Sequence, residues 1–289
     1  MPELFSVKGK RVIISGGARG LGAAVAGVLV AEAAHVAIID ILDEVGEQHA
    51  AALTAAGPGK AYYFHADIAK RAEAFAAVAS AVDALGGLDA LHNNAGVERS
   101  VPLEDIAEAD FDLVFGVNVK GCLWLSQAAV AHLRTAGNGG VIVNIGSDSA
   151  LMPYPTSAHY SASKGAVHAL TRSMAATWAP HGIRVNTAIP AAKTDMYYDM
   201  QANRTDEQRA QSAEWLKRNI LIGGDLGSVD EFAPMMVYLT SDASRFVTGQ
   251  ILAVNGGDEL CTIGRQSRYI MCWPELDLML YRNYKMCVS

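Results

Sequence analysis

Seven short apolar runs recur along the 289-residue chain, and longer alanine-rich segments separate most of them. Strands that alternate with helices predict a parallel sheet with helices on both faces. Strands buried on both faces are continuously apolar, as these runs are. The predicted fold class is therefore an α/β, doubly wound, Rossmann-like parallel sheet in a single domain. The runs are RVIIS (11–15), VAIID (36–40), YYFHAD (62–67), LDALHN (88–93), VIVNIGS (141–147), IRVNTAI (183–189) and QILAV (250–254).

The composition is that of a soluble globular domain, with 51% hydrophobic residues, 18% charged residues and a net charge of -7. Nucleic acid is not expected as a partner, because binding phosphates requires a clustered basic surface. The first ten residues lack the apolar core of a signal peptide. The most apolar stretch, 23–34, is short and contains Glu32, so we expect no membrane span and a cytoplasmic location. The four cysteines form no CxxC motif, which predicts reduced thiols and no metal site.

A glycine-rich turn follows the first apolar run. Gly16, Gly20 and Gly22 have the spacing GxxxGxG and lead into a helical segment. Glycines at such a turn allow the backbone to approach a pyrophosphate, which lies at the helix N-terminus. A turn of this kind can also serve only to pack a helix on a strand, so the motif by itself leaves both roles open.

The end of the second apolar run bears on the choice of cofactor. Asp40 follows Gly22 by eighteen residues, where a carboxylate can accept hydrogen bonds from the ribose hydroxyls of an adenosine. A carboxylate there also repels a 2′-phosphate, whereas Arg19 in the glycine-rich turn could pair with one. Because Ile41 supplies no second cation beside Asp40, the sequence favours NAD over NADP. The other reading of Asp40 is a solvated carboxylate at a strand end.

Tyr160 and Lys164 lie four residues apart in a segment with a helical pattern, so they share one helix face. A nearby ammonium stabilises the phenolate and moves the phenol pKa from about 10 toward the operating pH, as acid–base catalysis requires. Ser147, at the end of the fifth run, could donate a hydrogen bond to a substrate oxygen. Tyr-x-x-x-Lys pairs are common by chance, and it is the combination with the glycine-rich turn that indicates an enzyme.

Several motifs occur together in the order and at the spacing of one enzyme family. They are SGGARGLG (15–22), Asp40, Asp67, NNAG (93–96), Asn118, Ser147 and YSASK (160–164). Over residues 8 to about 257 the chain resembles the single-domain short-chain dehydrogenases/reductases, of the NAD-dependent type that includes bacterial hydroxysteroid and secondary-alcohol dehydrogenases.

The resemblance implies a role for each catalytic residue. Tyr160 would exchange a proton with the alcohol or carbonyl oxygen, and Lys164 would hold the nicotinamide ribose and lower the pKa of the tyrosine. Ser147 would orient the substrate oxygen, and Asn118 would hold a water in the proton relay. The expected cofactor site comprises Gly16, Arg19, Gly20, Leu21, Gly22, Asp40, Ile41, Asp67, Ile68, Asn94, Ala95, Gly96, Tyr160, Lys164, Pro190, Ala192 and Thr194.

One stretch departs from the family pattern. After the sixth strand the family has Pro-Gly and, several residues later, a Thr that meets the nicotinamide amide. Residues 190–194 read Pro-Ala-Ala-Lys-Thr, without the glycine and with one residue fewer. Ala192 and Thr194 are the residues expected to make this contact in the altered segment.

The segment at about 190–227 is expected to form a lid over the substrate. Its aromatic and thioether side chains, together with the loop before Tyr160, predict an apolar pocket for a small molecule. Such a pocket favours a hydrophobic secondary alcohol or ketone, whether steroid, alicyclic or aryl; alternatively, these side chains pack the lid itself or a subunit contact. The expected substrate-binding residues are Ser147, Tyr154, Tyr160, Met196 and Tyr197.

The chain divides into a catalytic domain at 1–257 and a C-terminal extension at 258–289. The extension is rich in Tyr, Trp and Leu, which argues against free disorder. It could cap the pocket or bury an interface in a homo-oligomer, a dimer or a tetramer.

Two other functions remain open at this point. An NADP(H)-dependent carbonyl or oxoacyl reductase would use Arg19 to bind the 2′-phosphate. A non-catalytic, dinucleotide-sensing protein would share the scaffold, but proteins of that sort are expected to lose Tyr160 or Lys164, and this chain has both.

Overall fold

The computed structural model describes residues 2–258 apart from 136–138, 153, 155 and 203. Within these residues, seven parallel strands form one sheet in the order β3-β2-β1-β4-β5-β6-β7. Each apolar run of the sequence coincides with one strand, so the predicted doubly wound sheet is confirmed. The strands are β1 (Arg11–Ser15), β2 (His35–Asp40), β3 (Ala61–His65), β4 (Ala90–Asn93), β5 (Gly140–Ile145), β6 (Ile183–Pro190) and β7 (Ile251–Val254).

The chain order reverses beside β1, which pairs in parallel with both β2 and β4. The connections on the two sides of β1 therefore run away from each other and leave a crevice beyond the carboxyl ends of β1 and β4. The glycine-rich turn follows β1 directly, and Asn94, Ala95 and Gly96 follow β4. The topology thus brings two of the predicted motifs to one edge of the sheet.

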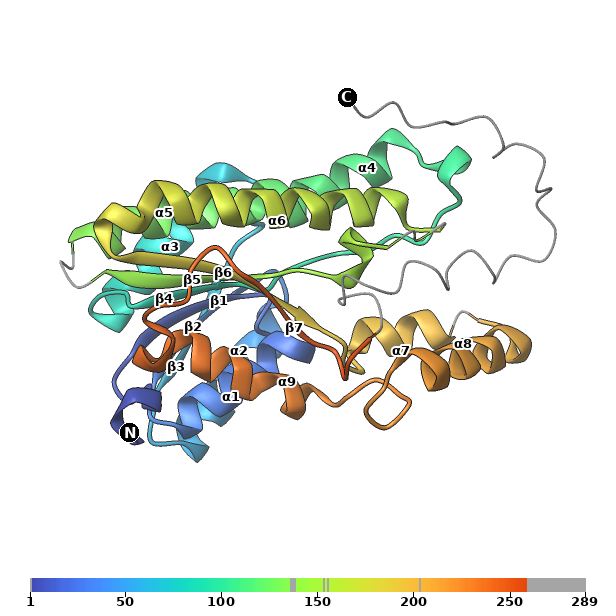
Figure 1. Ribbon diagram of the computed structural model, residues 1–289. Helices are drawn as coiled ribbons and strands as arrows, with labels where there is room; N and C mark the ends of the chain where they lie inside the picture. Colours follow the sequence, from blue (N-terminus) through green and yellow to red (C-terminus); the bar gives the residue numbers. More distant parts are fainter. Residues whose placement is uncertain (1, 136–138, 153, 155, 203, 259–289) are drawn as a thin grey trace, which may run out of the picture.

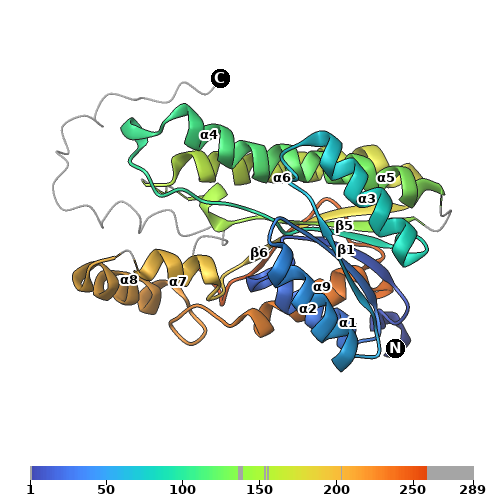
Figure 2. The ribbon, with the colours of Figure 1, turned by 180° about the vertical axis from the view of Figure 1, so that it is seen from behind.

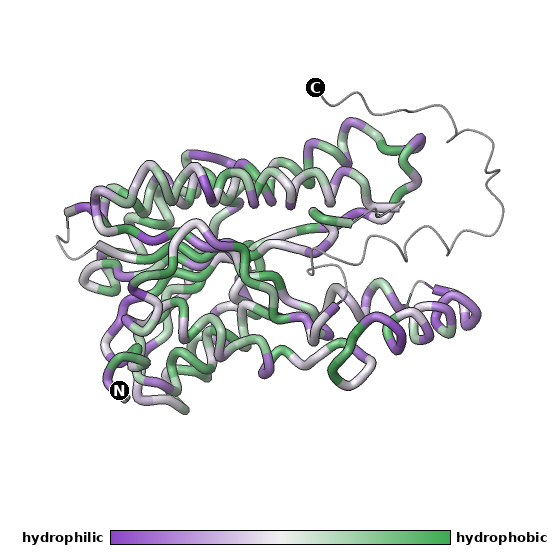
Figure 3. The backbone as a smooth tube through the Cα atoms, viewed as in Figure 1, coloured by the Kyte–Doolittle hydropathy of each residue, from purple (hydrophilic) through white to green (hydrophobic). Residues whose placement is uncertain are grey.

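Helices cover both faces of the sheet (Figures 1 and 2). Buried aliphatic side chains form one core cluster on each face, and the strands between them are mostly hydrophobic along the tube of Figure 3. One face carries α3 (Arg71–Leu85), α4 (Glu108–Phe115), α5 (Cys122–Thr135) and α6 (Ala158–Trp178), and the other carries α1 (Gly20–Ala31), α2 (Asp43–Ala56) and α9 (Val229–Thr240).

Two further helices, α7 (Asp195–Ala202) and α8 (Asp206–Asn219), extend from the carboxyl end of β6 in the predicted lid segment (Figure 1). The base of this segment is closed by two contacts. Ala192 forms a parallel β-bridge with Gly227, and Lys193 Nζ donates to Asp225 Oδ2 at 2.6 Å. The two ends of the segment are therefore tied together beside the sheet.

The helical run Glu108–Arg134 joins α4 and α5 through a π-helical turn at Gly116–Gly121. By length and composition this run is apolar enough to cross a membrane, but 56% of its most apolar window is buried inside the protein. Helix α5 packs against α3 and against strands β4 and β5. A core helix passes the same test, so the run is weak evidence for a membrane span.

Candidate active site

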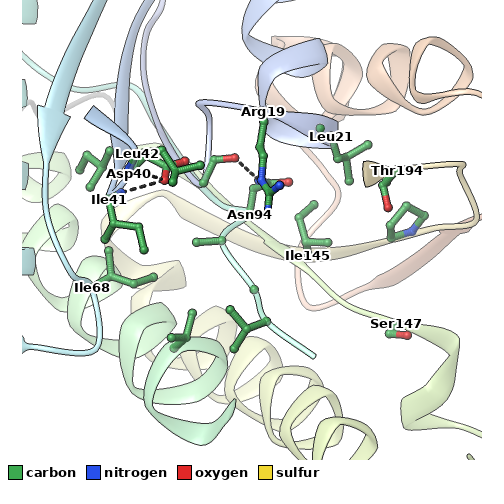
Figure 4. A pocket seen from close by; sticks show the side chains of 18 of the residues that line it. Arg19, Leu21, Asp40, Ile41, Leu42, Ile68, Asn94, Ile145, Ser147 and Thr194 are labelled. Atoms are coloured by element: carbon green, nitrogen blue, oxygen red, sulfur yellow. Dashed lines mark hydrogen bonds between the residues drawn. The ribbon is translucent and has the colours of Figure 1, made fainter. Parts of the chain in front are cut away.

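A cavity of about 410 Å³ opens at the crevice beyond the carboxyl ends of the strands (Figure 4). Most residues singled out from the sequence line it, namely Gly16, Arg19, Gly20, Leu21, Asp40, Ile41, Asp67, Ile68, Asn94, Ala95, Gly96, Ser147, Tyr160, Lys164, Pro190, Ala192 and Thr194. Seven further lining residues were not predicted from the sequence, namely Ile39, Leu42, Ala66, Val97, Val117, Ile145 and Gly146. All of these but Ile145 are direct neighbours of predicted residues. The strand ends were the signal that could have revealed them, except for Val117, which lies in the π-helical turn Gly116–Gly121 beside Asn118.

Gly22 does not line the cavity, although it belongs to the glycine-rich turn. A Cβ atom at Gly22 would lie 2.2 Å from the carbonyl oxygen of Gly16 and 2.5 Å from Nδ2 of Asn94. Nδ2 of Asn94 in turn donates to that same carbonyl oxygen at 2.9 Å. Gly22 therefore permits the close packing of α1 on the turn, which is a supporting position and not a cavity contact.

The Asp40 carboxylate is held in place by backbone N–H groups from two segments (Figure 4). Its Oδ2 accepts from Ala18 N at 3.0 Å, and its Oδ1 accepts from Ile41 N at 2.7 Å and from Leu42 N at 3.3 Å. These bonds fix the carboxylate between the glycine-rich turn and the loop after β2. Its negative charge therefore lies at a defined place on the cavity wall.

Lys164 lies on α6 with only 4% of its surface exposed. Its Nζ donates to the carbonyl oxygen of Ile145 at 2.8 Å and lies 5.7 Å from the ring centroid of Tyr160. Burial lowers the pKa of Lys164 from 10.5 to about 8, because an ammonium loses hydration in a low-dielectric surrounding. The lysine thus stays charged at neutral pH and titrates in the mildly alkaline range.

The pKa of Tyr160 is raised above its ordinary value of 10.0, mainly by desolvation and next by the negative charge of Glu98. The hydroxyl of Ser147 acts in the opposite direction. We expected Lys164 to lower this pKa, and the net shift in the structure has the other sign. The reason is that desolvation penalises the phenolate more than its polar neighbours stabilise it.

Ser147 lies two residues beyond the end of β5 and begins the short 3₁₀ turn Asp148–Ala150. Its Oγ accepts from Ser149 N at 3.2 Å and donates to Asp148 Oδ1 at 3.3 Å. We expected Ser147 to end the strand. The strand is shorter because the serine instead caps this turn, which fixes the position of its hydroxyl at the cavity.

Asn118 lies in the π-helical turn, buried and outside the cavity lining. Its Oδ1 accepts from Val97 N at 2.8 Å, and its Nδ2 donates to Val97 O and to Ser163 Oγ, both at 3.0 Å. The side-chain amide is therefore used to brace the loop after β4 against α6. Single π-helical turns are frequent at functional sites. Here the turn directs the side chain of Asn118 toward the loop after β4.

The amino-acid sequence of residues 10–207 matches the family described as short chain dehydrogenase. The chain belongs to the short-chain dehydrogenase family. Among its curated relatives, 2-(S)-hydroxypropyl-CoM dehydrogenase 3 of Xanthobacter autotrophicus is 37% identical over 251 residues, which cover 87% of this chain and 97% of the relative. The 2,5-dichloro-2,5-cyclohexadiene-1,4-diol dehydrogenase of Sphingobium indicum is 37% identical over 256 residues, covering 88% and 98%.

The solved structures that resemble this short-chain dehydrogenase include a gluconate 5-dehydrogenase from Burkholderia cenocepacia in complex with NADP and tartrate. That structure superposes with a TM-score of 0.80 at 32% sequence identity, and the match covers 88% of this chain and 97% of the other. Membership of the family makes the protein an oxidoreductase that acts on CH–OH donors and uses a nicotinamide dinucleotide.

The cavity of this short-chain dehydrogenase fits such a dinucleotide. Gly16 has a φ of +65°, and a Cβ atom there would lie 2.7 Å from Cα of Ala95, so only glycine leaves the turn open. Among the described residues no side chain caps the N-terminus of α1 at Arg19, and its N–H groups face the end where an anion is stabilised. Asp40, which accepts a hydrogen bond from Ala18 within this turn, offers fixed acceptor oxygens for ribose hydroxyls.

The residues predicted to bind substrate are only partly assembled around this cavity. Ser147 and Tyr160 line it. Tyr154 and Tyr197 do not line it. Tyr154 is 39% exposed, and Tyr197 on α7 packs edge-on against Tyr198, with the ring centroids 5.5 Å apart. The side chain of Met196 lies outside the described residues, as does the extension 259–289.

Proposed function

We propose that this short-chain dehydrogenase uses NAD(H) to interconvert a hydrophobic secondary alcohol and its ketone, with a steroid, alicyclic or aryl substrate and Tyr160 as the general acid–base. The observation that carries the proposal is the arrangement along one cavity. Ser147, Tyr160 and Lys164 line it together with Asp40, and Figure 4 shows Ser147 and Asp40 on opposite sides of it.

The chain's own groups supply the proton chemistry. During ketone reduction the Tyr160 hydroxyl gives its proton to the carbonyl oxygen, while Ser147 orients that oxygen by a hydrogen bond. Lys164, charged at neutral pH, would hold the nicotinamide ribose. Asn118 braces the loop at Val97, and because both Nδ2 hydrogens are donated to Val97 and Ser163, its side chain has no donor left for the relay water expected from the sequence. The bound dinucleotide supplies or accepts the hydride. Because the raised pKa keeps Tyr160 protonated, we expect alcohol oxidation, which needs the phenolate, to accelerate as the pH rises.

Asp40 supports the choice of NAD. Its carboxylate is fixed by backbone bonds, so it cannot turn away from a 2′-phosphate without breaking them. We assign the pyrophosphate to Gly16, Gly20 and Leu21, with Gly22 as the close-packed support of that turn. We assign the adenine to Ile41, Asp67 and Ile68, the nicotinamide ribose side to Asn94, Ala95 and Gly96, and the nicotinamide amide to Pro190, Ala192 and Thr194.

A second candidate keeps the same chemistry but uses NADP(H), as a carbonyl or oxoacyl reductase. Arg19 lines the cavity beside Asp40, and a solved relative holds NADP. The dissociation constants of NADH and NADPH, measured by fluorescence titration, decide between the two. Tighter binding of NADH supports NAD(H) as the cofactor, and tighter binding of NADPH would overturn it. Asp40→Ala should reduce the difference between the two dissociation constants.

Turnover tests the activity itself. We expect nicotinamide-dependent conversion of at least one compound in a broad panel of secondary alcohols and ketones. In Tyr160→Phe we expect the activity to fall about 10²-fold or more, the order typical of acid–base catalysis. Tyr62→Phe on β3 is the matched control and should keep full activity. Near-full activity in Tyr160→Phe would refute the role of Tyr160, and no turnover in the panel would favour a dinucleotide-sensing protein.

The protein is further proposed to act in the cytoplasm as a homo-oligomer. Large apolar side chains are exposed on α4, where Phe111 is 43% and Leu113 37% accessible. Phe246, before β7, is fully exposed. Light scattering coupled to gel filtration gives the mass in solution, and a monomer at assay concentrations would contradict the proposal.

A further inference from the structure

Glu98 lies on the loop after β4, outside the family motifs of the sequence. Ser157 Oγ donates to Glu98 Oε1 at 2.6 Å. Ser157 is the N-cap residue of α6, the helix that carries Tyr160 and Lys164, and its hydroxyl goes to Glu98 and not to the first turn of its own helix. The carboxylate is therefore fixed at the N-terminal end of α6, where the helix dipole favours a negative charge.

The loop around Glu98 is held on both sides. Val97 is clamped through its N–H and its carbonyl by the side chain of Asn118. On the other side, Val101 N donates to Thr156 O at 2.7 Å. Glu98 thus links the loop after β4 to the segment immediately before Tyr160, and it cannot move without breaking one of these bonds.

We propose that Glu98 is a positioning residue for the proton-transfer step, holding the start of α6 through Ser157 and placing one negative charge beside Tyr160 and Lys164. The proposal rests on the function proposed above for Tyr160. It adds a residue that touches neither substrate nor cofactor and acts through the tyrosine.

The charges around Tyr160 show why Glu98 matters more than its neighbours. After desolvation, the charge of Glu98 is the largest contribution that raises the pKa of Tyr160, followed among charges by Asp148 and then Tyr154. Burial lowers the pKa of Lys164, and Cys122 and then Glu98 oppose that shift. One carboxylate therefore keeps the phenol protonated and helps keep the ammonium charged.

The other groups around the site act differently. Lys164 Nζ lies 5.7 Å from the Tyr160 ring centroid, and the Ser147 hydroxyl lowers the pKa of Tyr160. Asp148 is itself raised in pKa by burial, and its bonds to Ser147, Ser149 and Asp258 oppose that shift. Because the charge of Glu98 contributes more to the raised pKa of Tyr160 than the charge of Asp148 does, Glu98 is the carboxylate whose removal should change the titration of the phenol most.

Two substitutions separate the charge from the hydrogen bond. Glu98→Gln removes the charge but keeps an oxygen that can accept from Ser157, whereas Ser157→Ala removes the bond and keeps the charge. Glu104→Gln, an exposed carboxylate on the same loop, is the matched control. The readout is the pH profile of kcat for alcohol oxidation, together with kcat/KM.

We expect Glu98→Gln to shift the apparent pKa for oxidation downward by about half to one pH unit, the size expected when one nearby, solvent-screened charge is removed. Ser157→Ala should lower kcat/KM with a smaller change in that pKa, and Glu104→Gln should match the wild type. An unchanged or raised apparent pKa in Glu98→Gln would overturn the proposal.

An ultraviolet difference titration keeps the test independent of turnover. The spectrum of each protein minus that of its Tyr160→Phe counterpart reports ionisation of Tyr160 alone, without any substrate. A lower phenol pKa in Glu98→Gln than in the wild type supports the inference even if the substrate panel gives no activity. Equal phenol pKa values in the two proteins refute it while leaving the proposed function untouched.

Discussion

Replacement of Lys164 by Met should change the pH dependence of stability in a way that only a buried ammonium can cause. The pKa of Lys164 is about 8 in the native protein, against 10.5 as its ordinary value. Since one pKa unit corresponds to about 1.4 kcal/mol, the native protein is destabilised by about 3 kcal/mol while both states carry the proton. Lys164 is 4% exposed, so solvent screening does little to reduce this figure.

The sign of the pH effect follows from proton binding. Below pH 8 both the folded and the unfolded lysine are charged, and the full penalty applies. Between pH 8 and 10.5 the unfolded chain binds more protons than the folded one, so stability rises with pH. From pH 7 to pH 9.5 the wild type should therefore gain about 2 kcal/mol in free energy of unfolding relative to Lys164→Met, which cannot titrate at this position.

The assay is equilibrium unfolding in urea at pH 7 and pH 9.5, without nucleotide, for the wild type and Lys164→Met. The variant also leaves the carbonyl of Ile145 without its donor, which costs about 1–3 kcal/mol. That cost does not depend on pH, so it cancels when the two pH values are compared. A stability difference between the two proteins that stays constant from pH 7 to pH 9.5 would refute the reasoning.

The glycine-rich turn and the base of the lid give two further predictions. Gly22→Ala should weaken dinucleotide binding at least about tenfold, because its Cβ would lie 2.2 Å from the carbonyl oxygen of Gly16 and the turn must shift. Gly27→Ala in the same helix, whose nearest contact is at 3.7 Å, should bind normally and gain up to about 1 kcal/mol in stability; equal titration curves for the two variants would contradict the packing argument. Asp225→Asn should change the free energy of unfolding by less than about 1 kcal/mol, because the side chains of its ion pair with Lys193 are 33% and 50% exposed and solvent screens them. It should alter kcat and KM together by loosening the lid. The double exchange Lys193→Asp with Asp225→Lys should restore both kinetic constants, and a failure of that rescue would exclude the ion pair as the cause.

The order of elements and the position of the cofactor crevice could be predicted from the sequence, because both depend on local patterns. Continuous apolar runs are typical of strands buried on both faces, and alternation with helices dictates parallel pairing. The turn at Gly16 and the carboxylate at Asp40 each directly follow or end such a run. Once the strand ends were predicted, most of the cavity lining followed from adjacency.

Other properties were decided only by tertiary structure, since they depend on contacts between distant segments and on burial. The bond between Ser157 and Glu98 joins residues 59 positions apart, and no local pattern marks either one. The pKa of Tyr160 has the opposite shift from the one that its spacing to Lys164 suggested, because desolvation depends on everything packed around the phenol. The spacing along the helix placed Tyr160 and Lys164 on one face, and the burial imposed by the surrounding fold set the pKa values of both side chains.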